Sequence, residues 1–475
     1  MKKKVKKNCK ALDNLFMWDY NIMLKDKKER IGRKMTIDDL YAGVRCEECG
    51  KFHRMTVDKI LIGKGVLNKL PELMRRYCVG KVFMLADKNT YRVAGERVES
   101  LLALRDIEIV KYIYEDDRVV PDEHSVGRAF MRFPNDCDIF IAVGSGVIND
   151  IGKLVGAVSG KKYMVIATAP SMDGYASALS SMERDGMKVS IPTGAPTAII
   201  GDVDILKEAP EQMLRAGIGD MLAKYVSICE WRLGSLICGE YYCEAIADMV
   251  RDSLRRCVDN AEGLMARDDA AIAAVFEGLV IAGISMSCAG MSRPASGVEH
   301  YISHIWDMRG LEFGTPVDFH GIQCAIGTVI ALRKYEELLR LPTPDMKAAR
   351  EYAKGFDYGA WSEKLRGFLG NAAEAMIRLE KSEGKYDPDA HAGRLEIIMT
   401  YWDHIRRAIE DELPRASDVE RLLGIIGAPR YPSDINIDEE LVPMTLCATR
   451  DIRDKYTLSR LVWDLGLTER LFGEV

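Results

Sequence analysis

The sequence of 475 residues lacks several features that would define a class of protein at once. No stretch reaches the roughly 18 apolar residues that a membrane-spanning helix needs, so we expect no membrane span. The basic start, MKKKVKK, is not followed by an apolar segment, which predicts no secretory signal. A net charge of −6 leaves no basic excess for general nucleic-acid binding. The chain also has no internal repeat and no low-complexity tract.

The cysteines are not arranged as a disulfide framework. The twelve cysteines are scattered from Cys9 to Cys447, mostly in apolar helical surroundings, as is typical of reduced thiols in a cytoplasmic enzyme. One segment differs, because CEECGKFH holds Cys46, Cys49 and His53 close together. A structural zinc site needs four ligands, and the fourth could only be distant, such as Cys9. We therefore favour a turn with two free thiols over a zinc site here.

The length exceeds what one hydrophobic core supports and indicates at least two domains. Between residues 57 and 205, continuous apolar runs alternate with helical stretches, which is typical of a parallel sheet covered on both faces. We predict a mainly helical N-terminal extension at 1–56, an α/β nucleotide-binding domain at 57–205 and a helical domain at 206–475. The segment MKVSIPTGAPTAIIGDVDIL is expected to form a hairpin that closes the α/β domain.

Three predicted strands are followed by polar loops, where ligands bind in parallel sheets. Asp87 ends one strand, at a position where a carboxylate can bond the ribose hydroxyls of NAD. A GSG loop with Gly144 and Gly146 leads into a helix whose first amides suit a pyrophosphate. The loop TAPSMDGYAS contains Asp173, for which a simple turn is the alternative reading. Three such loops on successive strands favour a nucleotide site.

Histidine is scarce, and three of the seven histidines fall within SGVEHYISHIWDMRGLEFGTPVDFH. Ser296 and Glu299 have the spacing of a capping box, which predicts a helix start. His300 and His304 are four residues apart and share one face of that helix. Two stacked core histidines are the alternative to a metal or catalytic pair.

Two helix breaks are expected in the helical half. Gly310 and Pro316 should interrupt the histidine window, so that His320 starts a new helix. The glycines of LRAGIGDML should break another helix, which resumes at Asp220. From the local pattern alone, a helix N-cap is the natural role for this aspartate.

Together these segments resemble the glycerol-1-phosphate dehydrogenases, in the superfamily of glycerol dehydrogenases, iron-type alcohol dehydrogenases and dehydroquinate synthases. The resemblance covers roughly residues 57–330 and is carried by VGSGVINDIGK, TAPSMDGYAS, AGIGD, SRPASGVEHYISHIWDM and DFHG. It implies a dehydroquinate synthase-like fold, with an α/β nucleotide-binding domain that has a parallel sheet and an all-α C-terminal domain. It also implies NAD or NADP and one divalent metal ion as cofactors. Carboxylate and imidazole ligands suit zinc, nickel or iron alike.

The resemblance assigns roles to particular residues. Asp220, His300 and His320 are implied as the metal ligands. Asp173 and His304 are implied to contact the substrate and act in catalysis, with Asp220 also beside the substrate.

Further residues are candidates for binding the substrate phosphate and the dinucleotide. We add Lys153 and Arg293 as candidates for binding a substrate phosphate, with a structural ion pair as the alternative for Arg293. The resemblance implies that the dinucleotide is lined by Gly146, Val147, Ile148, Asn149, Asp150, Thr168, Ala169, Pro170, Ser171 and Ser177. The loops after the predicted strands add Asp87 and Gly144.

The implied activity is the reversible NAD(P)-linked reduction of dihydroxyacetone phosphate to sn-glycerol 1-phosphate, by a cytoplasmic homodimer or larger homo-oligomer serving phospholipid biosynthesis. Three other readings stay open. The chain could be a glycerol or polyol dehydrogenase of the same fold, or a catalytically silent zinc-binding scaffold. It could also be a dehydroquinate synthase, although the first ligand there is usually Glu, whereas this chain has Asp220.

Overall fold

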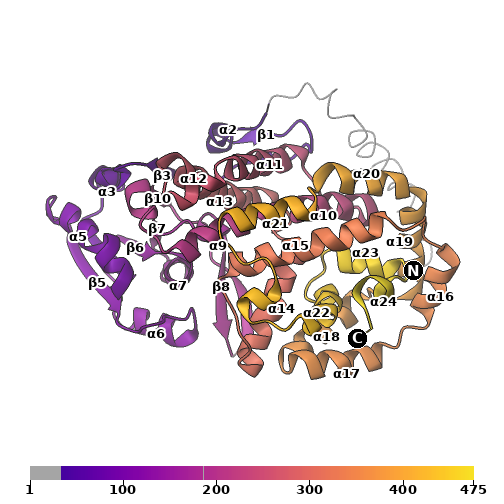
Figure 1. Cartoon of the computed structure of the whole chain (residues 1–475). Helices are drawn as coiled ribbons and strands as arrows, with labels where there is room; N and C mark the ends of the chain where they lie inside the picture. Colours follow the sequence, from indigo (N-terminus) through magenta and orange to yellow (C-terminus); the bar gives the residue numbers. More distant parts are fainter. Residues whose placement is uncertain (1–33, 186, 475) are drawn as a thin grey trace, which may run out of the picture.

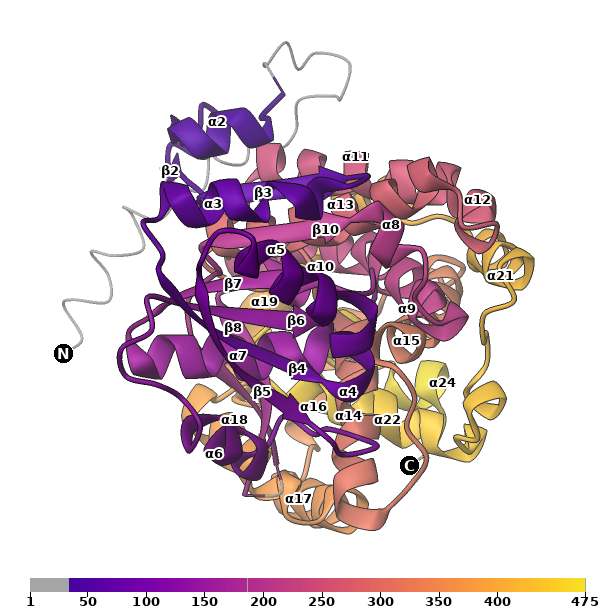
Figure 2. The same cartoon turned by 90° about the vertical axis from the view of Figure 1, so that its left-hand side faces the viewer.

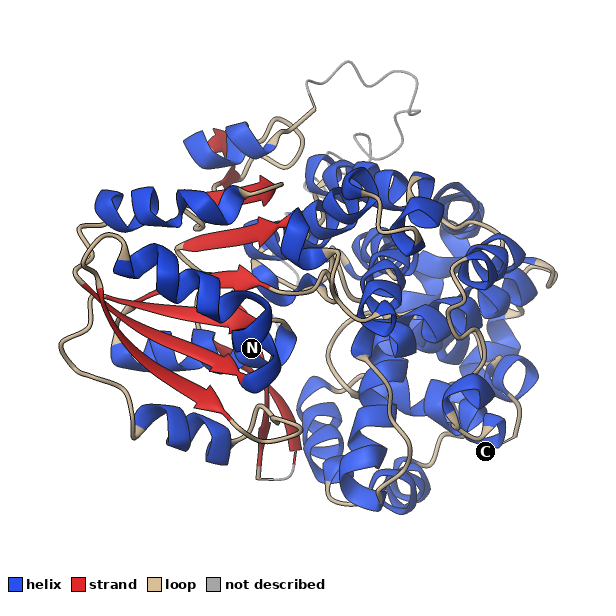
Figure 3. Cartoon of the chain, turned by 60° about the vertical axis from the view of Figure 1, so that its left-hand side comes forward, coloured by secondary structure: helices blue, strands red, loops and turns tan. Residues whose placement is uncertain are grey.

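The computed structural model describes residues 34–185 and 187–474. An α/β part and a helical part lie side by side (Figure 1). The strands of the α/β part point their carboxyl ends toward the helical part (Figure 3). The loops that follow the strands therefore meet the helical part, which is where the sequence predicted the ligands.

The α/β part is built on a six-stranded sheet in which every neighbouring pair is parallel. The strand order is β3-β10-β7-β6-β4-β5 (Figure 2). This arrangement confirms the predicted parallel sheet. The strands are β3 (Lys59–Gly63), β4 (Lys81–Asp87), β5 (Glu108–Tyr114), β6 (Ile139–Gly144), β7 (Lys162–Ala167) and β10 (Ala198–Asp202).

Both faces of the sheet are covered by helices. Along β4, Val82 and Met84 belong to one hydrophobic cluster, whereas Phe83 and Leu85 belong to another. This division follows from the alternation of side chains along a strand. The first cluster includes α3 (Leu70–Arg76) and α5 (Glu96–Ala103), and the second includes α7 (Gly146–Ser159) and continues into the helical part. Three shorter segments complete this part, namely α4 (Lys88–Thr90), the π-helix Tyr91–Gly95 and α6 (Glu123–Phe130).

The prediction that residues 187–206 form a hairpin is wrong, because strands β9 and β10 do not pair with each other. Strand β9 (Met187–Pro192) pairs antiparallel with the preceding β8 (Leu179–Arg184), which the sequence reading missed. Strand β10 instead enters the main sheet in parallel, between β3 and β7. All five residues of β10, AIIGD, are buried. Such a strand is stable inside a parallel sheet that is covered on both faces, and not in an exposed hairpin.

From residue 203 to the end of the described residues, the regular structure is helical, as expected. Helix α13 (Asp269–Ala289) is long and apolar enough to cross a membrane, but 67% of its most apolar window is buried inside the protein, as in a core helix. The other helices are α8 (Val203–Leu206), α9 (Glu211–Leu222), α10 (Lys224–Cys238), α11 (Glu244–Asp259), α12 (Ala261–Met265), α14 (Val298–Phe313), α15 (His320–Leu339), α16 (Met346–Lys354), α17 (Tyr358–Leu369), α18 (Ala372–Glu383), α19 (Pro388–Thr400), α20 (Trp402–Glu412), α21 (Ala416–Ile425), α22 (Val442–Ala448), α23 (Leu458–Asp464) and α24 (Thr468–Phe472).

Three predicted helix boundaries differ from the structure. Asp220 lies inside α9 rather than at a helix start, because the helix runs through both preceding glycines. Helix α14 has Gly297 as its N-cap with no side-chain cap, so the expected capping box of Ser296 and Glu299 does not form. That helix also continues past Gly310 to Phe313, although His320 does start the next helix as predicted.

The N-terminal extension was predicted to be mainly helical. Residues 1–33, with the basic start and Cys9, lie outside the described residues. Residues 34–56 contain one short helix, α2 (Ile37–Ala42), and an antiparallel pair of two-residue strands, β1 (Val44–Arg45) and β2 (Phe52–His53). The described portion is therefore a helix followed by a hairpin, and CEECGK forms the hairpin's turn.

Candidate active site

Close helix packing places Asp220 against the loop that follows β7. A Cβ atom on Gly217 would collide with the carbonyl oxygen of Pro170, and one on Gly219 would collide with the carbonyl oxygen of Gly321. Glycine therefore lets α9 approach both the TAPSMDG loop and the start of α15. The two glycines expected to break the helix instead bring three segments of the site together.

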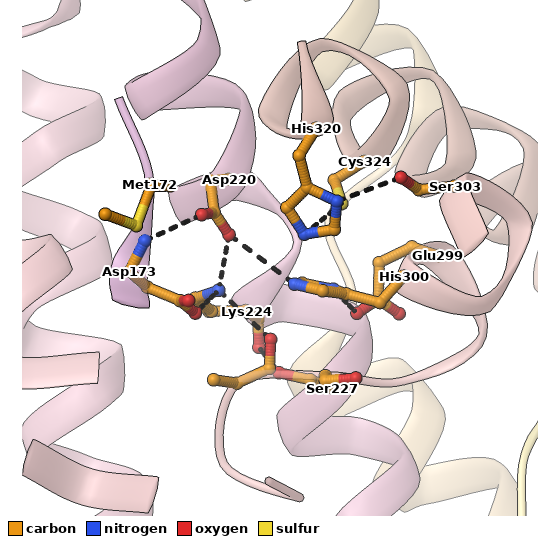
Figure 4. Close-up of polar contacts among 12 residues, drawn as sticks. Met172, Asp173, Asp220, Lys224, Ser227, Glu299, His300, Ser303, His320 and Cys324 are labelled. Atoms are coloured by element: carbon orange, nitrogen blue, oxygen red, sulfur yellow. Dashed lines mark hydrogen bonds and ion pairs between the residues drawn. The ribbon is translucent and has the colours of Figure 1, made fainter. Parts of the chain in front are cut away.

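The Asp220 carboxylate is the centre of the cluster (Figure 4). One oxygen accepts a hydrogen bond from the backbone amide of Asp173 at 2.9 Å. The other lies 2.8 Å from Lys224 Nζ and 3.6 Å from His300 Nε2. Burial alone would raise the pKa of Asp220, but Lys224 and His300 hold it far below the usual value. This carboxylate is therefore ionised and lies next to one of the predicted histidine ligands.

His300 is oriented from behind by a carboxylate. Its Nδ1 lies 2.8 Å from Glu299 Oε1, which leaves Nε2 facing Asp220. A carboxylate on the outer nitrogen is the usual support for a metal-binding imidazole. Burial alone would lower the pKa of His300, but Cys324, Asp220 and Glu299 raise it well above the usual value. The sequence reading gave Glu299 a capping role and so missed this one.

The other two histidines of the window also converge here. The ring of His320 lies 5.0 Å from that of His300 and 5.7 Å from that of His304, measured between centroids. His320 Nδ1 is 3.0 Å from Ser303 Oγ. Burial, and then the charge of His300, lower the pKa of His320 to about 4. His320 is thus neutral at pH 7, as a metal ligand must be.

Two side chains that the sequence reading did not select also lie in the cluster. Lys224 Nζ bridges Asp220 and the Asp173 carboxylate, which is 2.7 Å away. Burial alone would lower the pKa of Lys224, but the two aspartates raise it, so this lysine stays charged. Its i,i+4 spacing from Asp220 was the available signal. Cys324 Sγ lies 3.5 Å from His320 Nε2, one turn along α15.

The three polar loops lie at the carboxyl edge of neighbouring strands. Gly144 ends β6 and Gly146 starts α7, so the GSG loop leads directly into a helix N-terminus. Thr168 follows β7 and donates its amide to the carbonyl of Gly144. Asp87 ends the adjacent strand β4, where its carboxylate caps α4 by accepting from two backbone amides. The remaining predicted residues of the two loops follow in sequence within Val147–Asp150 and Ala169–Ser177.

Arg293 and Lys153, the two cations predicted to bind a phosphate, already form ion pairs and hydrogen bonds within the chain. Arg293 is 2% exposed, and its guanidinium pairs with Glu240 and donates to the carbonyl of Tyr456 at 2.7 Å. This is the ion pair that stood as the alternative. Lys153 lies 3.0 Å from Asp150 and donates to the carbonyl of Gly174, next to Asp173. Its contacts hold the TAPSMDG loop in place.

The donor set fits a bound cation. The Asp173 and Asp220 carboxylates share the single ammonium group of Lys224. The Glu299 carboxylate lies behind His300, and its Oε2 has no hydrogen-bond partner among the described residues. Ligand atoms of Asp173, Asp220 and His300 lie within 4.8 Å of one another, as do those of His300, His320 and Cys324. His300 belongs to both groups. A metal bound to His300 could therefore also take Asp220 from the first group and His320 from the second.

Known proteins show the same fold and related sequences. Residues 61–210 match the family described as iron-containing alcohol dehydrogenase. A probable glycerol dehydrogenase from Sinorhizobium meliloti 1021 superposes with a TM-score of 0.56 at 16% identity, over 88% of this chain and 97% of that one. A glycerol dehydrogenase from Schizosaccharomyces pombe gives a TM-score of 0.50, also at 16% identity, over 81% of this chain and 96% of that one.

Two relatives with higher sequence identity than these structures are both named glycerol-1-phosphate dehydrogenase. The glycerol-1-phosphate dehydrogenase (NAD(P)+) of Halalkalibacterium halodurans is 30% identical over 415 residues, which are 86% of this chain and 94% of the relative. That of Methanosarcina acetivorans is 31% identical over 58% of this chain and 75% of the relative.

The class follows from the fold and the partial match: a parallel α/β part faces a helical part as in solved glycerol dehydrogenases, and residues 61–210 match the iron-containing alcohol dehydrogenase family. Within that class, the identity to the bacterial relative over nearly its whole length is decisive. The chain belongs to the glycerol-1-phosphate dehydrogenase family of oxidoreductases.

Proposed function

We propose that this chain catalyses the reversible NAD(P)-linked reduction of dihydroxyacetone phosphate to sn-glycerol 1-phosphate, with one divalent metal held by Asp220, His300 and His320. The observation that carries the proposal is the convergence of these three side chains, from three helices, beside the loops at the carboxyl edge of the sheet. The names of relatives about 30% identical over most of the chain support the substrate and cofactor.

When bound, the metal would polarise the C2 oxygen of the substrate, and NAD(P) would carry the hydride. The dinucleotide would lie along Asp87, the Gly144–Asp150 loop and the loop residues Thr168–Ser171 and Ser177. The amides at the start of α7 suit its pyrophosphate. Zinc, nickel and iron all suit the ligand set.

The chain's own groups would orient the substrate and hold the proton. Lys224 and the backbone of Asp173 fix Asp220, and Lys224 also fixes the Asp173 carboxylate, which is proposed to bind substrate hydroxyls. The ring of His304 is half-buried, stacks on His320, and makes no hydrogen bond to any described residue. A ring nitrogen of His304 is therefore available to hold the proton exchanged with the substrate oxygen.

Two cations near His304 are further candidates for binding the substrate phosphate. Lys188 on β9 forms an ion pair with Asp307, one turn beyond His304 on α14. Arg453 donates to Ser190 on the same strand at 3.1 Å. The charges of Lys188 and Arg453 both act on His304, whose pKa is lowered chiefly by burial and by His320. We add both cations to the proposed substrate site.

Steady-state rates with dihydroxyacetone phosphate and with dihydroxyacetone test the proposal, measured with NADH and NADPH separately and with added zinc, nickel or iron. We expect reduction that requires the phosphate and a metal. Equal rates on the unphosphorylated ketone would favour a polyol dehydrogenase. Absence of NAD(P)H oxidation under every metal would contradict an oxidoreductase of either kind.

The cellular setting forms part of the same proposal. The eleven cysteines of the described residues are all free, which supports the cytoplasm as the working compartment. A homo-oligomeric state and a role of the product in lipid synthesis are proposed from the family alone.

A further inference from the structure

A second cluster of metal-ligating side chains lies outside the active site. It forms where the N-terminal hairpin meets the start of α11. Cys46 and Cys49 come from the hairpin turn, His53 from β2, and Cys243 from the N-cap of α11. One ligand atom from each of the four lies within 4.8 Å of all the others. The turn thus does not simply carry two free thiols, because a residue 190 positions after His53 completes the set.

Two distances within this cluster match the edges of a tetrahedral metal shell. Cys46 Sγ and Cys243 Sγ are 3.7 Å apart, and Cys243 Sγ is 3.6 Å from His53 Nε2. Four ligands around zinc give edges of about 3.8 Å between sulfurs and about 3.6 Å between sulfur and nitrogen. Cys49 Sγ lies 3.2 Å from His53 Nε2, slightly inside that range. A disulfide would need sulfurs about 2.05 Å apart, and all three cysteines are free.

Surrounding groups hold these ligands in a metal-binding orientation. His53 Nδ1 lies 3.2 Å from the carbonyl oxygen of Cys288, to which it can only donate. This hydrogen bond fixes the tautomer and leaves the Nε2 lone pair facing the three thiols. The hydroxyl of Tyr241 donates to Cys49 Sγ at 3.4 Å. The imidazole and one thiol thus each have an outer partner.

The hairpin turn is shaped to present both of its thiols. The amide of Gly50 donates to the carbonyl of Cys46 at 2.9 Å, and the amide of Cys46 donates to the carbonyl of Lys51 at 2.8 Å. Gly50 has φ of +69°, in the left-handed region that glycine adopts most easily. The sequence Cys-x-x-Cys-Gly therefore closes on itself and turns both sulfurs to one side.

The cluster also joins parts of the chain that are distant in sequence. His53 and Cys243 are each 1% exposed, and Cys243 packs with Trp231 and Ile246 in a small hydrophobic cluster separate from the main core. At the other end of the segment, the hydroxyl of Tyr41 accepts from the amide of Ile60 on β3. The segment 37–53 thus contacts the α/β part through α2 and the helical part through the hairpin.

We propose that Cys46, Cys49, His53 and Cys243 form a closed structural zinc site that fixes the N-terminal hairpin to the start of α11. Three thiolates and one imidazole favour zinc among divalent ions. Four protein ligands leave no open position, unlike the Asp220–His300–His320 set. The bound metal would link the N-terminal hairpin to helix α11 of the helical part, and the site does not depend on the proposed catalytic activity.

Metal analysis of the full-length chain with cobalt substitution tests this site. Cobalt bound by three cysteine sulfurs absorbs through thiolate-to-metal charge transfer, whereas an Asp–His–His set does not. We expect that absorption in the wild-type chain and in His300→Ala, with its loss in Cys46→Ser and Cys243→Ser. The two cysteine variants should each lose about one zinc equivalent per chain. Cys288→Ser is the matched control, because it keeps the carbonyl partner of His53 and should keep the metal.

The outcomes separate this site from the active site. A wild-type chain without the charge-transfer absorption would overturn the proposal, and this measurement needs no variant to fold. A Cys46–Cys243 disulfide found by non-reducing mass spectrometry would also overturn it. Loss of the absorption in His300→Ala with retention in Cys46→Ser would assign the thiolate to Cys324 instead.

Discussion

The carboxylate of Asp220 accepts a hydrogen bond from the backbone amide of Asp173, 2.9 Å away, and so joins helix α9 to the loop after β7. This bond links the two parts of the chain at the candidate active site. Lys224 strengthens the link, because its ammonium group contacts both aspartates and the carbonyl of Ala295. Buried polar contacts thus hold Asp220, the first of the proposed metal ligands, in place.

Lys224→Met should destabilise the protein strongly. The change leaves the buried Asp173 and Asp220 carboxylates without their counter-ion, and breaking a buried pair in this way costs about 3–5 kcal/mol. Denaturant unfolding measures the loss. Lys207→Met removes a lysine from the pairs with Asp204 and Asp269 near the surface and should cost far less. Equal losses in the two variants would contradict the buried network.

Gly217→Ala should damage both stability and activity. Its new methyl group would meet the carbonyl of Pro170, and overpacking of this kind costs about 1–3 kcal/mol. The displaced helix would also move Asp220 away from Asp173, so kcat should fall. Gly367→Ala in α17 is the control, because nothing lies within 4 Å of its Cβ position. That variant should be more stable by about 0.5–1 kcal/mol, with kcat unchanged.

Lys188→Met should raise the KM for dihydroxyacetone phosphate by about tenfold or more, since one charge-assisted hydrogen bond is worth about 1.5–3 kcal/mol. The rate on unphosphorylated dihydroxyacetone should change little. Lys64→Met, a change at a 59% exposed side chain, is the control. A similar loss on both substrates would assign Lys188 a structural role in its pair with Asp307 rather than phosphate binding.

Lys455 predicts a pH dependence of stability. Burial, and then the charge of Arg293, lower the pKa of Lys455 to about 7 in the folded chain, whereas an unfolded lysine keeps its proton up to about pH 10.4. Between these values the unfolded chain binds more protons, so the free energy of unfolding contributed by this group rises with pH. Relative to Lys455→Met, the wild type should gain stability from pH 7 to pH 10. A difference that stays constant over this range would contradict the lowered pKa.

The sheet could be predicted from sequence because its central strands β4, β6, β7 and β10 are largely continuous apolar runs. Strand β8 could not, since Leu179–Arg184 reads as a polar loop and pairs with β9 outside the main sheet. The predicted break in the helix before Asp220 was wrong for a different reason. Its glycines look like breaks, but they serve contacts with Pro170 and Gly321, which no local pattern contains.

The candidate site followed mainly from resemblance rather than from spacing. His300 and His304 share a helix face as predicted, yet spacing alone could not relate either of them to Asp220. Likewise, the sequence alone could not relate Cys243 to the CxxC turn, because their proximity depends on where α11 begins in the fold. Contacts between residues far apart in the sequence required the structure.

The most direct test of the active site is metal content and turnover of His320→Ala, measured on the same folded preparation. His124→Ala, a change at an exposed position, is the control and should match the wild type. We predict that His320→Ala loses about one metal equivalent and that its reduction of dihydroxyacetone phosphate falls by more than about 100-fold. Wild-type metal content and turnover in this variant would contradict the assignment of His320 as a ligand and, with it, the proposed active site.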